Sequence, residues 1–237
     1  MNMFMRSTLS AFLLASLCLP AYSAVRPQLT RIVAYASDKE TPVEIINESS
    51  ESYMVQSWLE DLDGKDANIP LVLTPPVMRL DGQKQGKLRL VVLPAEIPQD
   101  RESVYWLSIQ EIPPKAKTEA DNKVVIAIRS RLKVFVRPQG LNAKGAREAI
   151  KSITWDVEHD GTTTWLKANN ASAYYISFGD LKLNGTMLDD KYQMPAPHGS
   201  QRYAVPKALV GKKVTITYSA MSDYGSSGED LKTEVQL

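Results

Sequence analysis

The sequence has very few of the side chains that metal sites and disulfides need. Its 237 residues include one cysteine, Cys18, and two histidines, His159 and His198. Structural zinc sites are built from several Cys and His ligands, so this inventory excludes a zinc site of that kind and argues against a His-rich catalytic metal. A lone cysteine has no partner for an intramolecular disulfide. We therefore expect no metal, no cofactor and no disulfide, and stability that comes from core burial.

Recognisable catalytic motifs are also missing. Both histidines lie in turn-like stretches, at 158–161 and 197–199, and we interpret them as solvated loop residues. No glycine-rich phosphate motif is present. A Ser-His-Asp arrangement converges only in space, so the sequence leaves that alternative open. We predict no catalytic residue and no enzymatic activity.

The N-terminus shows the pattern of a secretory signal. Arg6 precedes an apolar run over residues 9–19, and small residues follow at 21–24. We predict a signal peptide over 1–23, cleaved after Ser23, and export of the mature chain across the inner membrane. An apolar run of about 11 residues is too short for the ~20 that span a bilayer, so no membrane insertion is expected. Cys18 follows Leu17, where a lipid-attachment motif requires a small residue, and therefore leaves with the signal.

The charge balance argues against a polyanionic partner. The chain has 28 Lys+Arg and 27 Asp+Glu, and cleavage after Ser23 removes only Arg6, leaving 27 charges of each sign. A neutral balance gives no electrostatic reason for binding nucleic acid or an anionic membrane surface.

From Val25 onward the apolar residues alternate in short runs separated by turn residues, which is typical of β-strands. No convincing amphipathic helix is found. Strands are expected at 30–35, 43–46, 53–59, 71–73, 88–92, 104–109, 124–136, 153–157, 164–168, 174–178, 201–205 and 214–218. The break near Pro138 divides the mature chain into domains 24–138 and 139–237, each of the size of an immunoglobulin-like sandwich. The predicted fold class is all-β.

The expected strand 124–136 is unusually long. Thirteen residues span roughly 43 Å at about 3.3 Å each, whereas a usual strand spans about 17–20 Å. Its even positions carry an apolar row that begins with Val124, Ile126 and Ile128. One interpretation is a final strand whose apolar residues all pack inside their own domain. The other is that the first half offers an apolar row and an unpaired edge to another protein.

Several motifs resemble one family. The stretches 100–107 (DRESVYWL), 112–114 (IPP) and 131–138 (RLKVFVRP) are similar in order and spacing to the PapD-like periplasmic chaperones of chaperone/usher pilus assembly. The resemblance continues through 56–59, 73–77, 170–175 and 222–225. Two features depart from the pattern: the second-domain cysteine pair of some members is absent, and Val136 replaces a common Tyr. The short segment 115–123 resembles the subgroup with a short loop before the donor strand.

The resemblance implies two immunoglobulin-like domains at an angle, with a cleft between them. It places Arg31 and Lys133 where the family binds the C-terminal carboxylate of a pilus subunit. It further implies a donor row that fills the subunit groove and an interdomain charge network. The donor row is Val124, Ile126 and Ile128, and the network is Glu102, Arg137 and Asp223.

The implied function is a chaperone that binds, folds and caps pilus subunits by donor-strand complementation and delivers them to an outer-membrane usher. The alternative is a structural or adhesive surface or pilus component built from the same sandwiches. The sequence leaves open the client subunits and pilus type, self-association of the free protein, and whether either of the bonds Thr74–Pro75 and Pro75–Pro76 is cis.

Overall fold

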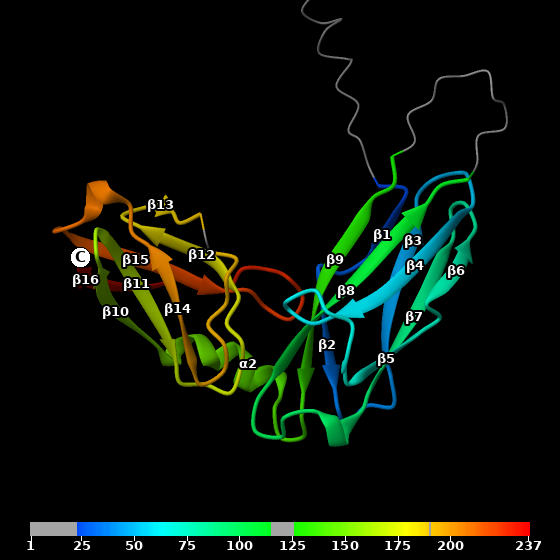
Figure 1. Ribbon diagram of the computed structural model, residues 1–237, viewed down its shortest axis with the longest axis horizontal. Coiled ribbons are helices and arrows are strands. Elements are labelled where there is room, and N and C mark those ends of the chain that lie inside the picture. Colours follow the sequence, from blue (N-terminus) through cyan, green and yellow to red (C-terminus); the bar gives the residue numbers. More distant parts are fainter. Residues whose placement is uncertain (1–22, 115–125, 190) are drawn as a thin grey trace, which may run out of the picture.

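The computed structural model describes residues 23–114, 126–189 and 191–237. Figure 1 shows two β-rich halves set at an angle to each other, joined where β9 leads toward α2. This confirms the all-β class. Apart from Ser23, the predicted signal peptide lies outside the described residues, and so does Val124. Across the described ranges, no helix is long and apolar enough to cross a membrane.

The first half is a sandwich of two sheets. One sheet has the order β1 (Val25–Pro27), β3 (Thr41–Asn47), β7 (Gln85–Val92) and β5 (Leu71–Thr74). The other has the order β2 (Arg31–Tyr35), β9 (Arg129–Arg137), β8 (Ser103–Ile112), β4 (Tyr53–Glu60) and β6 (Val77–Leu80). A 3₁₀ turn, η1 (Pro94–Glu96), precedes β8. Alternate residues of both sheets point inward, and Ile45, Leu88 and Leu107 are fully buried between them.

The second half is also built from two sheets. One sheet has the order β10 (Ile153–Asp160), β11 (Thr163–Asn170) and β14 (Gly199–Ala204). The other has the order β13 (Thr186–Met187), β12 (Phe178–Leu183), β15 (Lys213–Ala220) and β16 (Leu231–Gln236). The 3₁₀ turns η2 (Ile150–Ser152) and η3 (Lys207–Leu209) complete it. Its core contains stacked and edge-on contacts of Trp155, Phe178 and Tyr218. Such aromatic packing supplies burial without a disulfide.

A short helix, α2 (Ala143–Ala149), corrects the expectation of an all-strand chain. Asn142 caps it, because its side chain accepts a hydrogen bond from the Gly145 N–H. The helix turns alanines toward the second core. Alanine gives only a weak periodic signal, so the sequence pattern does not indicate this helix.

Three other expectations need correction. The long strand begins at Arg129 rather than 124, because residues 126–128 have no strand pairing of their own. Residues 174–177 are irregular, since the Asn170 side-chain amide donates to the Tyr174, Pro195 and Ala196 carbonyls and holds the segment away from a ladder. His159 lies in β10 rather than in a loop, although it is exposed.

The cis bond left open by the sequence is Thr74–Pro75.

Candidate functional site

A buried charge network joins the two halves of the chain. Arg137, the last residue of β9, donates from Nε to Glu102 Oε1 at 2.8 Å. Its Nη1 and Nη2 each donate to a carboxylate oxygen of Asp223 at 2.7 Å, which is a bidentate pair. The side chains of Arg137, Glu102 and Asp223 are 3%, 2% and 25% exposed. The structure thus brings together all three residues predicted for this network.

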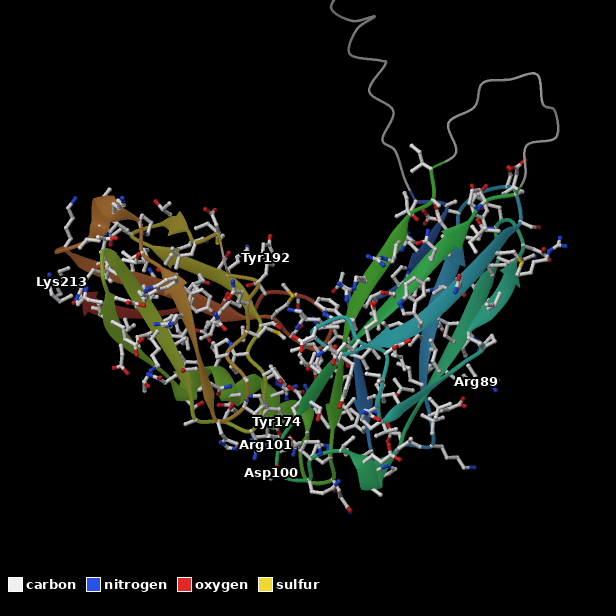
Figure 2. All side chains as sticks on the ribbon, in the orientation of Figure 1. Arg89, Asp100, Arg101, Tyr174, Tyr192 and Lys213 are labelled. Atoms are coloured by element: carbon white, nitrogen blue, oxygen red, sulfur yellow. The ribbon has the colours of Figure 1, made fainter. Side chains whose placement is uncertain are left out.

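Further bonds hold the network in place. The second oxygen of Glu102 accepts from the Tyr175 N–H at 2.9 Å, and the Glu102 N–H donates to the Ala173 carbonyl at 2.8 Å. The Tyr174 ring, labelled in Figure 2, lies 5.6 Å from the Arg137 guanidinium. Burial lowers the pKa of Arg137, but its bonds to Asp223 and Glu102 outweigh this and raise the pKa above its usual range. Arg137 is therefore a permanent cation between two carboxylates.

Arg31 and Lys133 lie next to each other. Strands β2 and β9 pair in parallel with Arg31 directly opposite Lys133, so both side chains share one face of the sheet. Arg31 is 9% exposed, its guanidinium lies 5.5 Å from the centre of the Phe135 ring, and it contacts the Met221 sulfur. Its buried Nε has no hydrogen-bond partner among the described residues.

Lys133 is held by a weaker set of contacts. Its ammonium donates to the Tyr192 carbonyl at 3.3 Å and lies 5.7 Å from the centre of the Trp106 ring. Figure 2 shows Tyr192 on the second half of the chain. Burial, together with the nearby charge of Arg31, lowers the pKa of Lys133 to about 8. Burial also lowers the pKa of Arg31.

Two neighbouring cations in a half-dry site suit an anion. Neither forms an ion pair with an acidic side chain that the structure describes, and a carboxylate would relieve both the burial cost and their mutual repulsion. Arg31 lines a cavity of about 280 Å³ between the halves, with Phe135 on one side and Tyr175 and Met221 on the other. Lys133 is not one of the residues that line this cavity. Lys133 lies beside Arg31 on the neighbouring strand.

The described part of the predicted donor row is exposed. Ile126 is 71% exposed and Ile128 is 38% exposed. The same even positions continue into β9, where Leu132, Val134 and Val136 are buried in the first core. The apolar residues at even positions, interrupted by Ser130, are therefore exposed before β9 and buried within it. This contradicts the interpretation that all of them pack inside their own domain.

The edge of β9 beside this row is partly open. Its parallel partner β2 is in register only from Lys133 to Arg137. On that side, no described strand pairs with residues 129–132. The other edge of β9 is fully occupied by β8 over Arg129–Val136. The open edge thus leads from the exposed isoleucines directly to the two cations.

Sequence reasoning missed the contributions of the second half. Tyr192 and Met221 contact the two cations from loops, and no local pattern marks either residue because the contacts exist only once the halves have docked. The histidines remain outside this region: His159 contacts Thr164 and His198 contacts the Ala171 carbonyl.

Comparison with family profiles gives two matches. Residues 24–142 match the N-terminal domain of the PapD pili and flagellar-assembly chaperones, and residues 148–230 match the C-terminal domain of the PapD pili assembly chaperones.

Individual proteins give the same likeness. The chain is 33% identical over 208 residues to the chaperone protein LpfB of Salmonella typhimurium, covering 87% of each chain. It is 32% identical over 235 residues to the chaperone protein FocC of Escherichia coli, covering 97% of this chain and 98% of the relative. The crystal structure of the E. coli chaperone DraB superimposes with a TM-score of 0.72 at 29% identity, covering 90% of this chain and 96% of DraB. The SafB chaperone, solved with the SafA pilin of Salmonella enterica, shares the fold with a TM-score of 0.78 at 20% identity, covering 92% of this chain and 99% of that chain.

Proposed function

Because this chain belongs to the PapD family of pilus-assembly chaperones, we propose that it binds pilus subunits in the periplasm by lending them a strand. In this proposal it caps their incomplete groove and passes them to an outer-membrane usher without catalysing a reaction. In this proposal the signal peptide directs export and is cleaved after Ser23. The family membership decides against the alternative of a structural or adhesive surface component.

The observation that carries the proposal is the half-exposed apolar row beside an open strand edge. When a subunit strand pairs with this edge, Ile126 and Ile128 become buried in the groove of the subunit. Each buried side chain of this size contributes roughly 1.5–3 kcal/mol, and the backbone ladder adds to it. We include Val124 as the third member of the row on the same parity.

The two cations give the bound strand an end point. We propose that the C-terminal carboxylate of the subunit binds between Arg31 and Lys133. An arginine can grip a carboxylate with two N–H groups, and a lysine adds a point charge. The unsatisfied Nε of Arg31 and the lowered pKa of Lys133 support this role.

We also propose that Glu102, Arg137 and Asp223 fix the angle between the domains. Two of these residues belong to the first half of the chain and Asp223 belongs to the second, so the network spans the junction. Its hydrogen bonds at 2.7–2.8 Å hold the cleft at one width.

The direct test is capture of a natural client. A tagged chaperone purified from periplasm should bring a pilus subunit with it at a one-to-one ratio. Recovery of the chaperone alone from cells that make the matching subunit would contradict the proposal.

Ile126→Asp should weaken subunit binding more than tenfold while leaving the chaperone folded. A charge on the donor row cannot enter an apolar groove without a large desolvation cost, but Ile126 is 71% exposed in the free protein. The matched control is Val77→Asp, which puts the same charge at a 50% exposed apolar position on the far edge strand β6. Equal affinities for the two variants, or unfolding of the Ile126 variant, would count against the donor row.

Subunit affinity should fall as the pH rises through about 8. Lys133 has a pKa of about 8 in the free chaperone, and a bound carboxylate raises it, so binding above pH 8 requires proton uptake. The contribution of Lys133 to affinity is then complete below pH 8 and is lost above it. The subunit affinity should fall by up to about tenfold per pH unit in that range. Titration calorimetry at pH 7 and pH 9 measures this difference. Lys133→Arg is the control, since arginine stays charged at both pH values and its affinity should change little.

A further inference from the structure

A buried carboxylate lies where the first and last strands of the N-terminal domain meet. Glu111 belongs to β8 and is 4% exposed. Its Oε2 accepts from the Val25 N–H at 2.8 Å and from the Ser23 hydroxyl at 2.9 Å. The Glu111 side chain takes part in no ion pair among the described residues, although a buried carboxylate is costly without a positive partner.

The same residue also holds the donor row. The Glu111 N–H donates to the Ile128 carbonyl at 3.1 Å, and Oε1 accepts from the Ile128 N–H at 3.4 Å. One side chain therefore links the start of β1 to the last residue of the row, with one oxygen on each.

Cleavage after Ser23 would create a charge at this place. The new amino terminus is the nitrogen of Ala24, which lies between Ser23 and Val25, the two residues that bond to Oε2. Ala24 is already fixed, because its carbonyl accepts from the Glu48 N–H at 2.7 Å. The nearby Glu48 carboxylate is taken by Arg26 at 2.6 Å, which leaves Glu111 as the acid for the new ammonium group.

We propose that the Ala24 ammonium of the mature chain forms an ion pair with Glu111, and that this pair positions Ile128 for subunit binding. The pair replaces the Ser23 hydroxyl, which leaves with the signal. Glu111 is a positioning residue, and removal of the signal completes the site that holds the donor row. This inference rests on the proposed function through the cleavage site and the donor role of Ile128.

The test uses the free mature protein and needs no subunit. N-terminal sequencing first establishes that the chain begins at Ala24. Glu111→Gln keeps the shape of the side chain but removes its charge. The Ile128 and Val25 amides should then exchange with deuterium about tenfold faster. The N-terminal amine, followed by mass spectrometry of its peptide, should react severalfold faster with an acylating reagent at pH 7, because an ion-paired ammonium deprotonates less readily.

Two further chains separate this effect from general destabilisation. Glu96→Gln removes the charge of an exposed glutamate in η1 and should change neither readout. A chain with Gly-Ser ahead of Ala24 retains Glu111 but moves the ammonium away, and its Ile128 amide should also exchange faster. Unchanged exchange and amine reactivity in Glu111→Gln, or a mature chain that begins elsewhere, would overturn the proposal. Amide exchange and amine reactivity are measured on the free protein, so they do not depend on whether the chaperone binds subunits. The ion pair and the proposed chaperone function can therefore be rejected separately.

Discussion

Arg137→Ala should lower the free energy of unfolding of the chaperone by about 3–5 kcal/mol, which is the usual cost of removing one partner from a buried ion pair. The reason is the environment of Glu102. Its side chain is 2% exposed, and it would keep a buried carboxylate with only the Tyr175 N–H as a partner from the second domain. Urea denaturation followed by tryptophan fluorescence measures the loss.

The control for this prediction lies next to the network in sequence. Arg101 pairs with Asp100 at 2.8 Å, but these side chains are 46% and 61% exposed. An exposed pair of this kind contributes at most about 1 kcal/mol, so Arg101→Ala should shift the transition very little. If both variants lost the same stability, the network would not be the buried structural element described above.

The second large effect is expected at the two cations. Arg31→Ala and Lys133→Ala should each weaken subunit binding by about 2–5 kcal/mol, which is roughly 30-fold or more in Kd. The reason is that each substitution leaves the subunit carboxylate with half of its charge partners in a partly dry cleft. In cells, the level of the matching subunit in the periplasm should fall and pili should be lost.

These substitutions should not destabilise the free chaperone to the same degree. Burial already disfavours the charges of both residues and lowers their pKa values, and the charge of Arg31 lowers the pKa of Lys133 further. Arg129→Ala is the matched control, because it removes a cation from the same face of β9 but farther from the cleft. The guanidinium of Arg129 lies 5.9 Å from the centre of the Trp58 ring. Unchanged subunit levels and normal pili in the Arg31 and Lys133 variants would reject the anchoring role.

The sequence predicted the parts of the fold that depend on local periodicity. The alternation of Leu132, Val134 and Val136 indicated a buried strand face, and all three are in the core. It could not show where that strand begins, because Ile126 and Ile128 continue the same alternation. The tertiary contacts separate core from surface: β8 pairs with β9 from Arg129 onward, and Ile126 and Ile128 lie before that pairing begins.

The site was predictable only through the family resemblance. Arg31 and Lys133 are about 100 positions apart, and no local pattern shows that parallel pairing places them side by side. The resemblance also named Glu102, Arg137 and Asp223, whose contacts the structure shows. Neither the local patterns nor the resemblance indicated Glu111 or Tyr192. Glu111 contacts the start of the first strand, and Tyr192 contacts Lys133 from a loop of the second domain, so both roles depend on tertiary structure.

We propose that a pilus subunit pairs with the edge of the first domain that carries Ile126. A photoreactive amino acid placed at position 126, with one at position 77 on the opposite edge of the same sheet, tests this directly in cells that produce the matching subunit. We expect a strong chaperone–subunit cross-link from position 126 and almost none from position 77. Cross-linking at 77 with none at 126 would contradict it.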